Sequence, residues 1–503
     1  MPQSAPLPTS AQPKPASSNL TSEGYHRGLG KRQMQMISIG GAIGTGLFLG
    51  AGSRLQQIGP SLALVYLVCG IFAFLMLRAM GELVMHRPTS GSFVSYAQEF
   101  LGPKASYIAG SMAFLNWAMA GIGDITAVAL YMRFWGSFDS VPQWVFALVA
   151  LVLITVMNMI GVRWFGEMEF WFSLVKVGAL VTFLVVGTIV LGLQLPLAGH
   201  TPGLHLITQN GGIFPHGVLP ALVLVQGVVF AYAAIELVGT AAGECEDVEN
   251  VLPKAINTVM WRIALFYVGT ITLLVLLLPW NSYHAGVSPF VTFFANLGIP
   301  GVDSIMNIVV LTAALSSLNS GLYSTGRILR ALALDGSAPR YLTHMNKNAI
   351  PSAAILTTVS IYLVGVVLNY LLPAQIFEIV LNVSSIGILG TWAFIVLCQI
   401  KLRQAINNGT VRATSFPMPG APFTSWLTLA FYACVLVMMA FDYPNGTWSF
   451  CAIPVIALLL VIGWKTFRHV PNHEAVPQTV PSIQLTEDLL EHTEHTRKRP
   501  NKD

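Results

Sequence analysis

The chain has 503 residues, of which 54% are hydrophobic and only 10% are charged, and its formal net charge is +4. Soluble globular domains carry roughly 25% charged residues, and the mean hydropathy here is +0.66. This composition excludes an ordinary soluble protein and indicates an integral membrane protein in a lipid bilayer. The small positive charge requires no nucleic-acid partner, because basic residues are expected next to membrane spans.

Apolar stretches of the length that crosses a bilayer as a helix, about 17 to 25 residues, recur about twelve times. The expected spans are residues 36–52, 60–80, 107–132, 144–160, 170–193, 218–242, 263–280, 304–322, 353–372, 376–398, 426–440 and 450–464. We therefore predict an all-α polytopic membrane protein with about twelve transmembrane helices.

The basic residues predict the orientation. Most of the 26 Lys and Arg residues fall on one set of connections, whereas the long connections at residues 194–217 and 281–303 contain none. Because cytoplasmic segments near spans carry the excess of Lys and Arg, we expect both termini in the cytoplasm. The polar tails, residues 1–32 and 469–503, are then expected to be cytoplasmic.

The first span is interrupted by glycine. Residues 39–52 read IGGAIGTGLFLGAG and include six glycines. A membrane helix can break only where the freed backbone faces protein or a water-filled cavity, so this segment predicts an internal binding site for a small solute. Close helix packing through small residues is the alternative explanation for the glycines.

The sixth span has a similar interruption. Residues 230–244 read FAYAAIELVGTAAGE, and the two segments lie five spans apart. Paired interrupted helices are typical of transporters built from inverted repeats. The N-terminus of a half-helix attracts a carboxylate and unwound carbonyls accept from an ammonium group, so an amino acid would suit both breaks.

Charged residues within the expected spans are few, and each needs a reason because its insertion costs about 2.5 to 3.5 kcal/mol. Lys176 and Glu236 could neutralise one another or backbone carbonyls, or they could carry a coupling proton. Asp124 could line the pore or cap an extracellular helix end. Arg78 and Glu82 form an i, i+4 pair that we interpret as structural.

Polar uncharged residues also occur within spans. Asn116 in the third span could contact a substrate side chain or bond to a neighbouring helix. The eighth span contains LTAALSSLNSGLYSTGR, and Ser384 and Ser385 lie in the tenth. Hydroxyl groups in membrane helices often bond to their own i−4 carbonyls, so we expect most of them to be structural and one or two to face the cavity.

Signatures of enzymes and metal sites are missing from the sequence. The chain contains no H-E-x-x-H, G-x-S-x-G or P-loop motif, and its histidines form no ligand cluster. We therefore expect neither an enzyme nor an ATP-driven pump, and no cofactor or metal.

Four segments together resemble the bacterial amino acid transporter family of the amino acid, polyamine and organocation superfamily. They are GGAIGTGLFLGAG, GELVMHRPTSGSFVSYAQEFLG, FAYAAIELVGTAAGE with PKAIN, and SSLNSGLYSTGR. The resemblance covers nearly the whole chain, from Gly24 to Arg468.

The resemblance implies a LeuT-type core of ten helices in two inverted five-helix repeats. The first repeat would occupy residues 33–200 and the second residues 201–400, followed by two peripheral spans within residues 401–468. It places Ile43, Gly44, Thr45 and Gly46 near the substrate carboxylate. It also places the carbonyls of Phe230, Tyr232 and Ala233 toward the ammonium group, with Phe230 as an outer lid.

The activity implied by the resemblance is proton-driven uptake of a neutral amino acid by alternating access across a bacterial inner membrane. Lys176 matches a position where some relatives have a lysine in place of a sodium site, and Glu236 matches an acidic position. Stretches such as MAFDYPNGT resemble those of family members that transport L-asparagine, and this resemblance implies L-asparagine as the substrate. Serine, glycine, gamma-aminobutyrate or an aromatic amino acid are the alternatives, and a channel or a nutrient sensor is the alternative class. The sequence does not predict an oligomeric state.

Overall fold

The structure is a computed structural model that describes residues 43–89, 92–236, 239, 248–372 and 375–467. All of them belong to one compact unit bounded by Gly28 and His469. The expected tails and the first part of the expected first span lie outside the described residues. Within them the regular segments are helical, and a single isolated bridge pairs Leu197 with His200. The all-α prediction is therefore confirmed.

The first half of the chain contains α2 (Thr45–Phe48), α3 (Gly50–Ile58), η1 (Gly59–Ser61), α4 (Leu62–His86), α5 (Ser92–Leu101), α6 (Pro103–Met132), η2 (Gly136–Phe138), α7 (Gln143–Ile160), α8 (Val162–Gly192) and α9 (His205–Gln209). The second half contains α10 (Val218–Val223), α11 (Val225–Val229), η3 (Phe230–Tyr232), α13 (Val248–Arg262), η4 (Ile263–Gly269), α14 (Thr270–Leu277), η5 (Trp280–Ser282), α15 (Pro289–Ala295), α16 (Val302–Leu334), η6 (Arg340–Thr343), α17 (Ser352–Leu371), α18 (Ile376–Asn407), α19 (Phe423–Met439), α20 (Asn445–Cys451) and α21 (Ile453–Phe467).

In the described part of the chain, nine helical segments are long and apolar enough to cross a membrane. They are Gly50–His86, Pro103–Met132, Gln143–Ile160, Trp164–Gly192, Val248–Leu277, Val302–Leu334, Ser352–Leu371, Ile376–Asn407 and Asn445–Phe467. Two shorter apolar helices, Val218–Tyr232 and Phe423–Met439, accompany them. Most of the expected spans therefore have a helical counterpart, and the interrupted sixth span is represented by one of the two short helices.

Several boundaries differ from the expected spans, among them the ends of α8, α16 and α18, and two differences are informative. At the first, α3 leads through η1 into α4, because Gly59 adopts a positive φ of 58° and Pro60 follows it at the start of the 3₁₀ turn. At the second, helix extends N-terminally from residue 263 to Val248, with a π-helical segment at Ile263–Gly269. Hydropathy alone could not find α13, because that helix is amphipathic and only weakly apolar.

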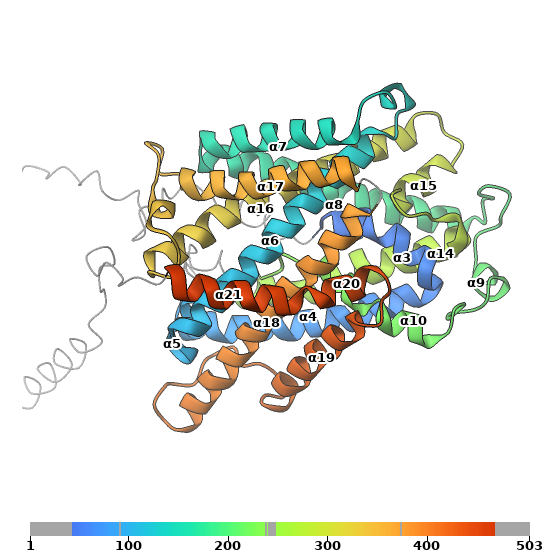
Figure 1. The fold of residues 1–503 in the computed structure, drawn as a ribbon. Coiled ribbons are helices and arrows are strands. Elements are labelled where there is room, and N and C mark those ends of the chain that lie inside the picture. The colour runs from blue at the N-terminus through green and yellow to red at the C-terminus, as the bar shows by residue number, and fades with distance from the viewer. Residues whose placement is uncertain (1–42, 90–91, 237–238, 240–247, 373–374, 468–503) are drawn as a thin grey trace, which may run out of the picture. The chain divides into compact units, whose positions relative to one another are not determined.

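Helix α6 is the central element of the unit, and it packs most extensively against α18 and α16. Of its most apolar 18-residue window, 78% is buried, whereas the corresponding window of Asn445–Phe467 is only 6% buried. Helices α7, α16 and α17 lie side by side, and α6 runs diagonally through the middle of the view (Figure 1). The exposed faces of α7 and α8 carry valine and leucine, as lipid contact requires.

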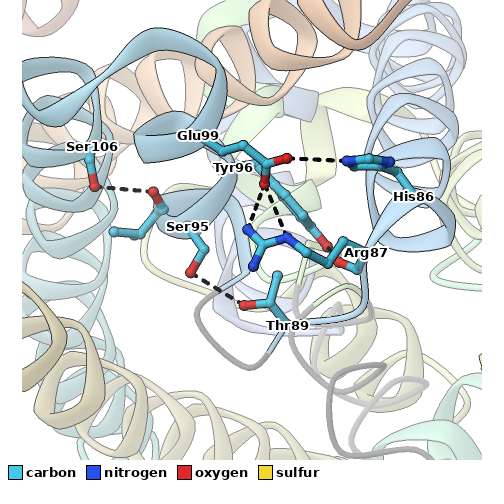
Figure 2. A network of polar contacts seen from close by, with 8 residues as sticks. His86, Arg87, Thr89, Ser95, Tyr96, Glu99 and Ser106 are labelled. Atoms are coloured by element: carbon cyan, nitrogen blue, oxygen red, sulfur yellow. Dashed lines mark hydrogen bonds and ion pairs between the residues drawn. The ribbon is translucent and has the colours of Figure 1, made fainter. Parts of the chain in front are cut away.

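Helix α5 is fixed to the end of α4 by a polar network. Glu99 accepts from Arg87 Nε at 3.1 Å and lies 3.1 Å from His86 Nε2, while the Tyr96 hydroxyl donates to the Arg87 carbonyl at 2.7 Å (Figure 2). On the other side, Ser106 at the start of α6 donates to the Val94 carbonyl. This short helix therefore links the end of α4 to the beginning of α6.

Candidate binding site at two helix breaks

The first break lies where the glycine-rich segment predicted it. Gly44 has an extended backbone, with φ −132° and ψ −164°, and α2 then runs for only four residues. Leu49, with φ −113°, separates α2 from α3. The N–H groups of a first helical turn have no partner within the helix, so the start of α2 presents polar backbone inside the bundle.

The second break follows η3. Ala233 has ψ 152°, and Ala234 has a positive φ of 72°, which is uncommon for a residue other than glycine. The Ala233 N–H donates to the Phe230 carbonyl at 3.0 Å, and no regular helix continues through Glu236. Both interrupted segments expected from the sequence are therefore real breaks.

The two breaks lie against each other. A Cβ atom added to Gly46 would lie 2.8 Å from Ala231 Cα and 2.9 Å from Phe230 Cδ1, which is too close for any side chain. A Cβ atom added to Gly44 would lie 3.6 Å from Ser317 Oγ, an ordinary contact. Gly46 therefore serves close packing between the broken helices, whereas Gly44 has space beside it. Close helix packing therefore explains Gly46, whereas the binding-site explanation remains open for Gly44.

Asp124 faces the first break from α6. Its Oδ1 accepts from Thr45 Oγ1 at 2.8 Å, and its side chain is 1% exposed. Its Oδ2 has no hydrogen-bond partner among the described residues. Asp124 lies well inside α6 and not at its end, so the interpretation as a helix cap is wrong. The carboxylate lies at the break, consistent with the alternative that it lines the pore.

Lys176 is fully buried, and its partner is Glu169 rather than Glu236. Its Nζ donates to Ser316 Oγ at 2.9 Å and lies 3.8 Å from Glu169 Oε1. The sequence interpretation that Lys176 and Glu236 neutralise one another is therefore not what the structure shows. Glu169 was missed, although residues seven apart on a helix lie on the same face, and this spacing relates 169 to 176.

Glu236 lies directly after the second break and is 4% exposed. Its Oε2 accepts from Trp392 Nε1 of α18 at 3.2 Å, and its carbonyl accepts from the Gly239 N–H at 2.9 Å. A buried carboxylate beside a neutral side-chain donor suits a proton-carrying role, which stays a prediction.

The aromatic residues of the second break differ in where their side chains lie. The Tyr232 hydroxyl donates to the Tyr66 carbonyl at 2.6 Å, and its ring stacks on Tyr267 with centroids 4.6 Å apart. Phe230 instead contacts the position of Gly46. The Tyr232 side chain therefore points away from the break, where only its backbone and Ala233 lie.

Asn116 connects two helices. Ser384 Oγ of α18 donates to Asn116 Oδ1 at 2.7 Å. A Cβ atom added to Gly387 of α18 would lie 2.6 Å from the backbone nitrogen of Asn116. Helices α6 and α18 thus approach closely at this point. The geometry favours the interpretation of Asn116 as a link between helices, and its contact with a substrate stays a prediction.

Two hydroxyl groups of the eighth span are structural in the expected way, because they bond to carbonyls of their own helix. Ser324 donates to the Ser320 carbonyl at 2.8 Å and Thr325 to the Gly321 carbonyl at 3.0 Å, both at i−4. Asn319 Oδ1 accepts from Asn158 Nδ2 of α7 at 2.8 Å. Ser316 differs from these residues, because its hydroxyl lies between Lys176 and Glu169.

Arg78 and Glu82 are both structural, but they do not bond to each other as the i, i+4 spacing suggests. Glu82 is fully buried and pairs with Arg403 at 2.6 Å, and it accepts from Gln399 Nε2 at 2.9 Å. Arg78 donates to the Pro417 carbonyl at 2.7 Å. The two residues therefore hold the connection between α18 and α19 against α4.

A second, partly buried cluster of polar side chains connects the broken helices to their neighbours. Arg54 of α3 lies 3.8 Å from Glu378 of α18, and Ser53 donates to the same carboxylate at 2.7 Å. Gln226 of α11 donates to Asp442 at 2.8 Å, and burial raises the pKa of the Asp442 carboxyl above its ordinary value. The cluster holds α3 to α18 and α11 to the connection between α19 and α20.

Residues 33–474 match the family model for amino acid permeases. This chain belongs to the amino acid permease family. It is 67% identical over 473 residues to the L-asparagine permease of Escherichia coli strain K12, covering 94% of each chain. It is 56% identical to L-asparagine permease 1 of Mycobacterium tuberculosis strain H37Rv, over 88% of this chain and 91% of the relative.

A third relative is the L-asparagine permease of Streptomyces coelicolor, with 52% identity over 90% of this chain and 92% of the relative. Membership of the permease family makes the chain a multi-pass membrane transporter and not an enzyme. The family resemblance stated from the four sequence segments is thereby confirmed.

Proposed function

We propose that this chain is a secondary active transporter that imports L-asparagine together with a proton by alternating access. The observation that carries the proposal is the direct contact of two helix breaks beside buried charged residues. The substrate is suggested by the relatives, which are named as L-asparagine permeases and match over nearly the full chain.

The substrate would lie between the two breaks. The backbone of Ile43, Gly44, Thr45 and Gly46 would hold its carboxylate, because helix N-termini favour anions. The carbonyls of Phe230, Tyr232 and Ala233 would accept from its ammonium group. Gly44 is the best placed of these residues, since its Cα has space where Gly46 has none.

Lys176 and Glu236 are the candidates for carrying the coupling proton. Both are buried within the bundle, and neither would be retained there without a reason because charges inside a membrane are expensive. Lys176 lies in a cluster with two other polar side chains, which provides a route for a proton. Its fixed or titrating charge would take the place of a bound sodium ion.

The wider architecture of the proposal is a LeuT-type core of ten helices with two peripheral helices, α19 and α20–α21. Residues 33–200 and 201–400 would form the inverted repeats, and both termini would face the cytoplasm of a bacterial inner membrane. The two breaks, five expected spans apart, support the repeat. The distribution of Lys and Arg supports the orientation.

Uptake of labelled L-asparagine into proteoliposomes tests the proposal. We expect saturable accumulation that requires a pH gradient or membrane potential and does not require sodium. A panel of unlabelled serine, glycine, gamma-aminobutyrate, phenylalanine and aspartate should compete less well than asparagine. Flux that does not saturate and never exceeds the external concentration would indicate a channel, and a sodium requirement without a proton requirement would reject proton coupling.

A further inference from the structure

Glu169 is a buried carboxylate of the Lys176 cluster to which the proposed function gives no role of its own. Its side chain is fully inaccessible to solvent on α8, a helix that otherwise presents apolar residues. Its Oε1 accepts from Ser316 at 2.7 Å and from Ser173 at 3.5 Å. Its Oε2 has no hydrogen-bond partner in the part of the chain that the structure describes. A carboxylate so incompletely satisfied in the interior calls for a functional reason.

The Ser316 hydroxyl connects Glu169 to Lys176. Lys176 Nζ donates to Ser316 Oγ at 2.9 Å, Ser316 donates onward to Glu169 Oε1 at 2.7 Å, and the direct Nζ to Oε1 separation is 3.8 Å. A hydroxyl can accept one hydrogen bond and donate another at the same time. The three side chains therefore form a directed chain from ammonium to carboxylate.

We propose that Glu169 takes up the coupling proton that Lys176 releases, with the Ser316 hydroxyl as the bridge. The proton leaves Nζ for Ser316 Oγ as the hydroxyl proton passes to Glu169 Oε1. An ammonium and a carboxylate thus become a neutral amine and a neutral carboxylic acid, and the total charge is unchanged. This inference rests on the proposed proton coupling at Lys176.

The surroundings leave few other groups to exchange this proton. Helices α7 and α14, which pack against α8, contain no acidic or basic residue. On α6, Asp124 is a second carboxylate that acts electrostatically on Lys176. On α16, Arg327 lies over the ring of Tyr323 and Arg330 donates to the Thr343 carbonyl, and Asp303 lies in its first turn. Glu169 is therefore the carboxylate that a hydroxyl joins directly to Lys176.

The test compares two transport modes in proteoliposomes that contain the full chain. Accumulation of labelled asparagine driven by a pH gradient requires net proton movement, whereas exchange of internal for external asparagine does not. We expect Glu169→Gln to lower accumulation about tenfold or more, since an opposite charge a few ångströms away shifts a partner's pKa by about 1 to 3 units and each unit is a factor of ten in the protonation equilibrium. Exchange should remain close to that of the wild type.

Glu167→Gln is the matched control, because Glu167 lies on the same helix, is partly exposed and accepts from Trp171 Nε1 at 3.1 Å. It should leave both modes unchanged. Glu169→Asp should restore part of the accumulation. Adding Glu169→Gln to Lys176→Met should cause no further loss, because Glu169 acts through Lys176.

Accumulation by Glu169→Gln at the wild-type level and with the wild-type pH profile would overturn the proposal. Equal loss of accumulation and exchange, without recovery in Glu169→Asp, would also overturn it, because it would make Glu169 merely structural. If Glu169→Gln does not fold, Ser316→Ala provides the same comparison by removing the bridge. A wild-type protein that ignores the proton gradient would reject the proposed function itself, whatever the variants do.

Discussion

The two helix breaks are built from different residues. The first consists of glycines and Thr45, whose hydroxyl bonds to the buried Asp124. The second consists of alanines and aromatic residues, and the Tyr232 side chain packs away from the break against Tyr66 and Tyr267. The first break therefore brings polar groups and charge to the contact, whereas the second is held in shape by ring packing.

This difference indicates a division of labour. A break with small residues and unpaired backbone N–H groups leaves room for a charged ligand, whereas at a break fixed by stacked rings the side chains hold the shape and only the backbone carbonyls are offered to a ligand. Substitutions at the first break that do not disturb its packing, such as those of Gly44 and Asp124, should therefore change transport more than stability. Substitutions at the second should do the reverse.

Gly46→Val and Gly44→Val should have the largest effects, and together they separate packing from binding. Both should abolish asparagine uptake while membrane insertion remains. Only Gly46→Val should lower Tm clearly, because its Cβ would collide with Ala231 and overpacking costs about 1 to 3 kcal/mol. Uptake assays and thermal unfolding in detergent check this. Normal uptake by both variants would remove the first break from the site.

Asp124→Asn should have the next largest effect. The substitution keeps an acceptor for Thr45 but removes the negative charge that faces the first break. Hydrogen bonds to charged groups contribute about 1.5 to 3 kcal/mol, so uptake should fall about 10- to 100-fold. The exposed Asp139 provides a control, and Asp139→Asn should transport normally. Unchanged uptake by Asp124→Asn would mean that the charge difference between the breaks has no role.

Asn116→Leu tests specificity and should have a moderate effect. If Asn116 contacts the substrate amide, asparagine uptake should fall much more than alanine uptake, because the buried amide group would lose its partner. Ser384→Ala is the companion variant, since it removes only the bond between the helices. Equal losses for both substrates in both variants would make Asn116 a link between α6 and α18 alone.

The sequence predicted the breaks because their cause is local. Glycine content and interrupted hydropathy are visible in a window of fifteen residues, and Gly44, Gly46 and Phe230 were found this way. The family resemblance supplied their roles. Partners from distant helices were not predictable, because no local pattern relates Glu236 to Trp392 or Asn116 to Ser384.

The charged residues show the same limit. The i, i+4 spacing of Arg78 and Glu82 suggested a pair, yet Glu82 bonds to Arg403 on another helix. Side chains four residues apart on a helix can meet, but an ion pair of this kind on an exposed helix surface contributes only about 0.2 to 0.5 kcal/mol. A buried carboxylate takes the partner that satisfies it best, and tertiary packing decides which one is within reach.

Tyr232→Phe should have the smallest effect on transport, and it sharpens the comparison from the side of the second break. The variant keeps the ring stacked on Tyr267 but loses the bond to the Tyr66 carbonyl, which costs about 0.5 to 1.5 kcal/mol. We expect a lower Tm and nearly unchanged asparagine affinity, because only the backbone of Tyr232 lies at the break. Tyr267→Phe, which retains the bond between Tyr232 and Tyr66, is the matched control. A strong loss of affinity at wild-type Tm would place the Tyr232 hydroxyl in the binding site and end the distinction between a polar break and a packed one.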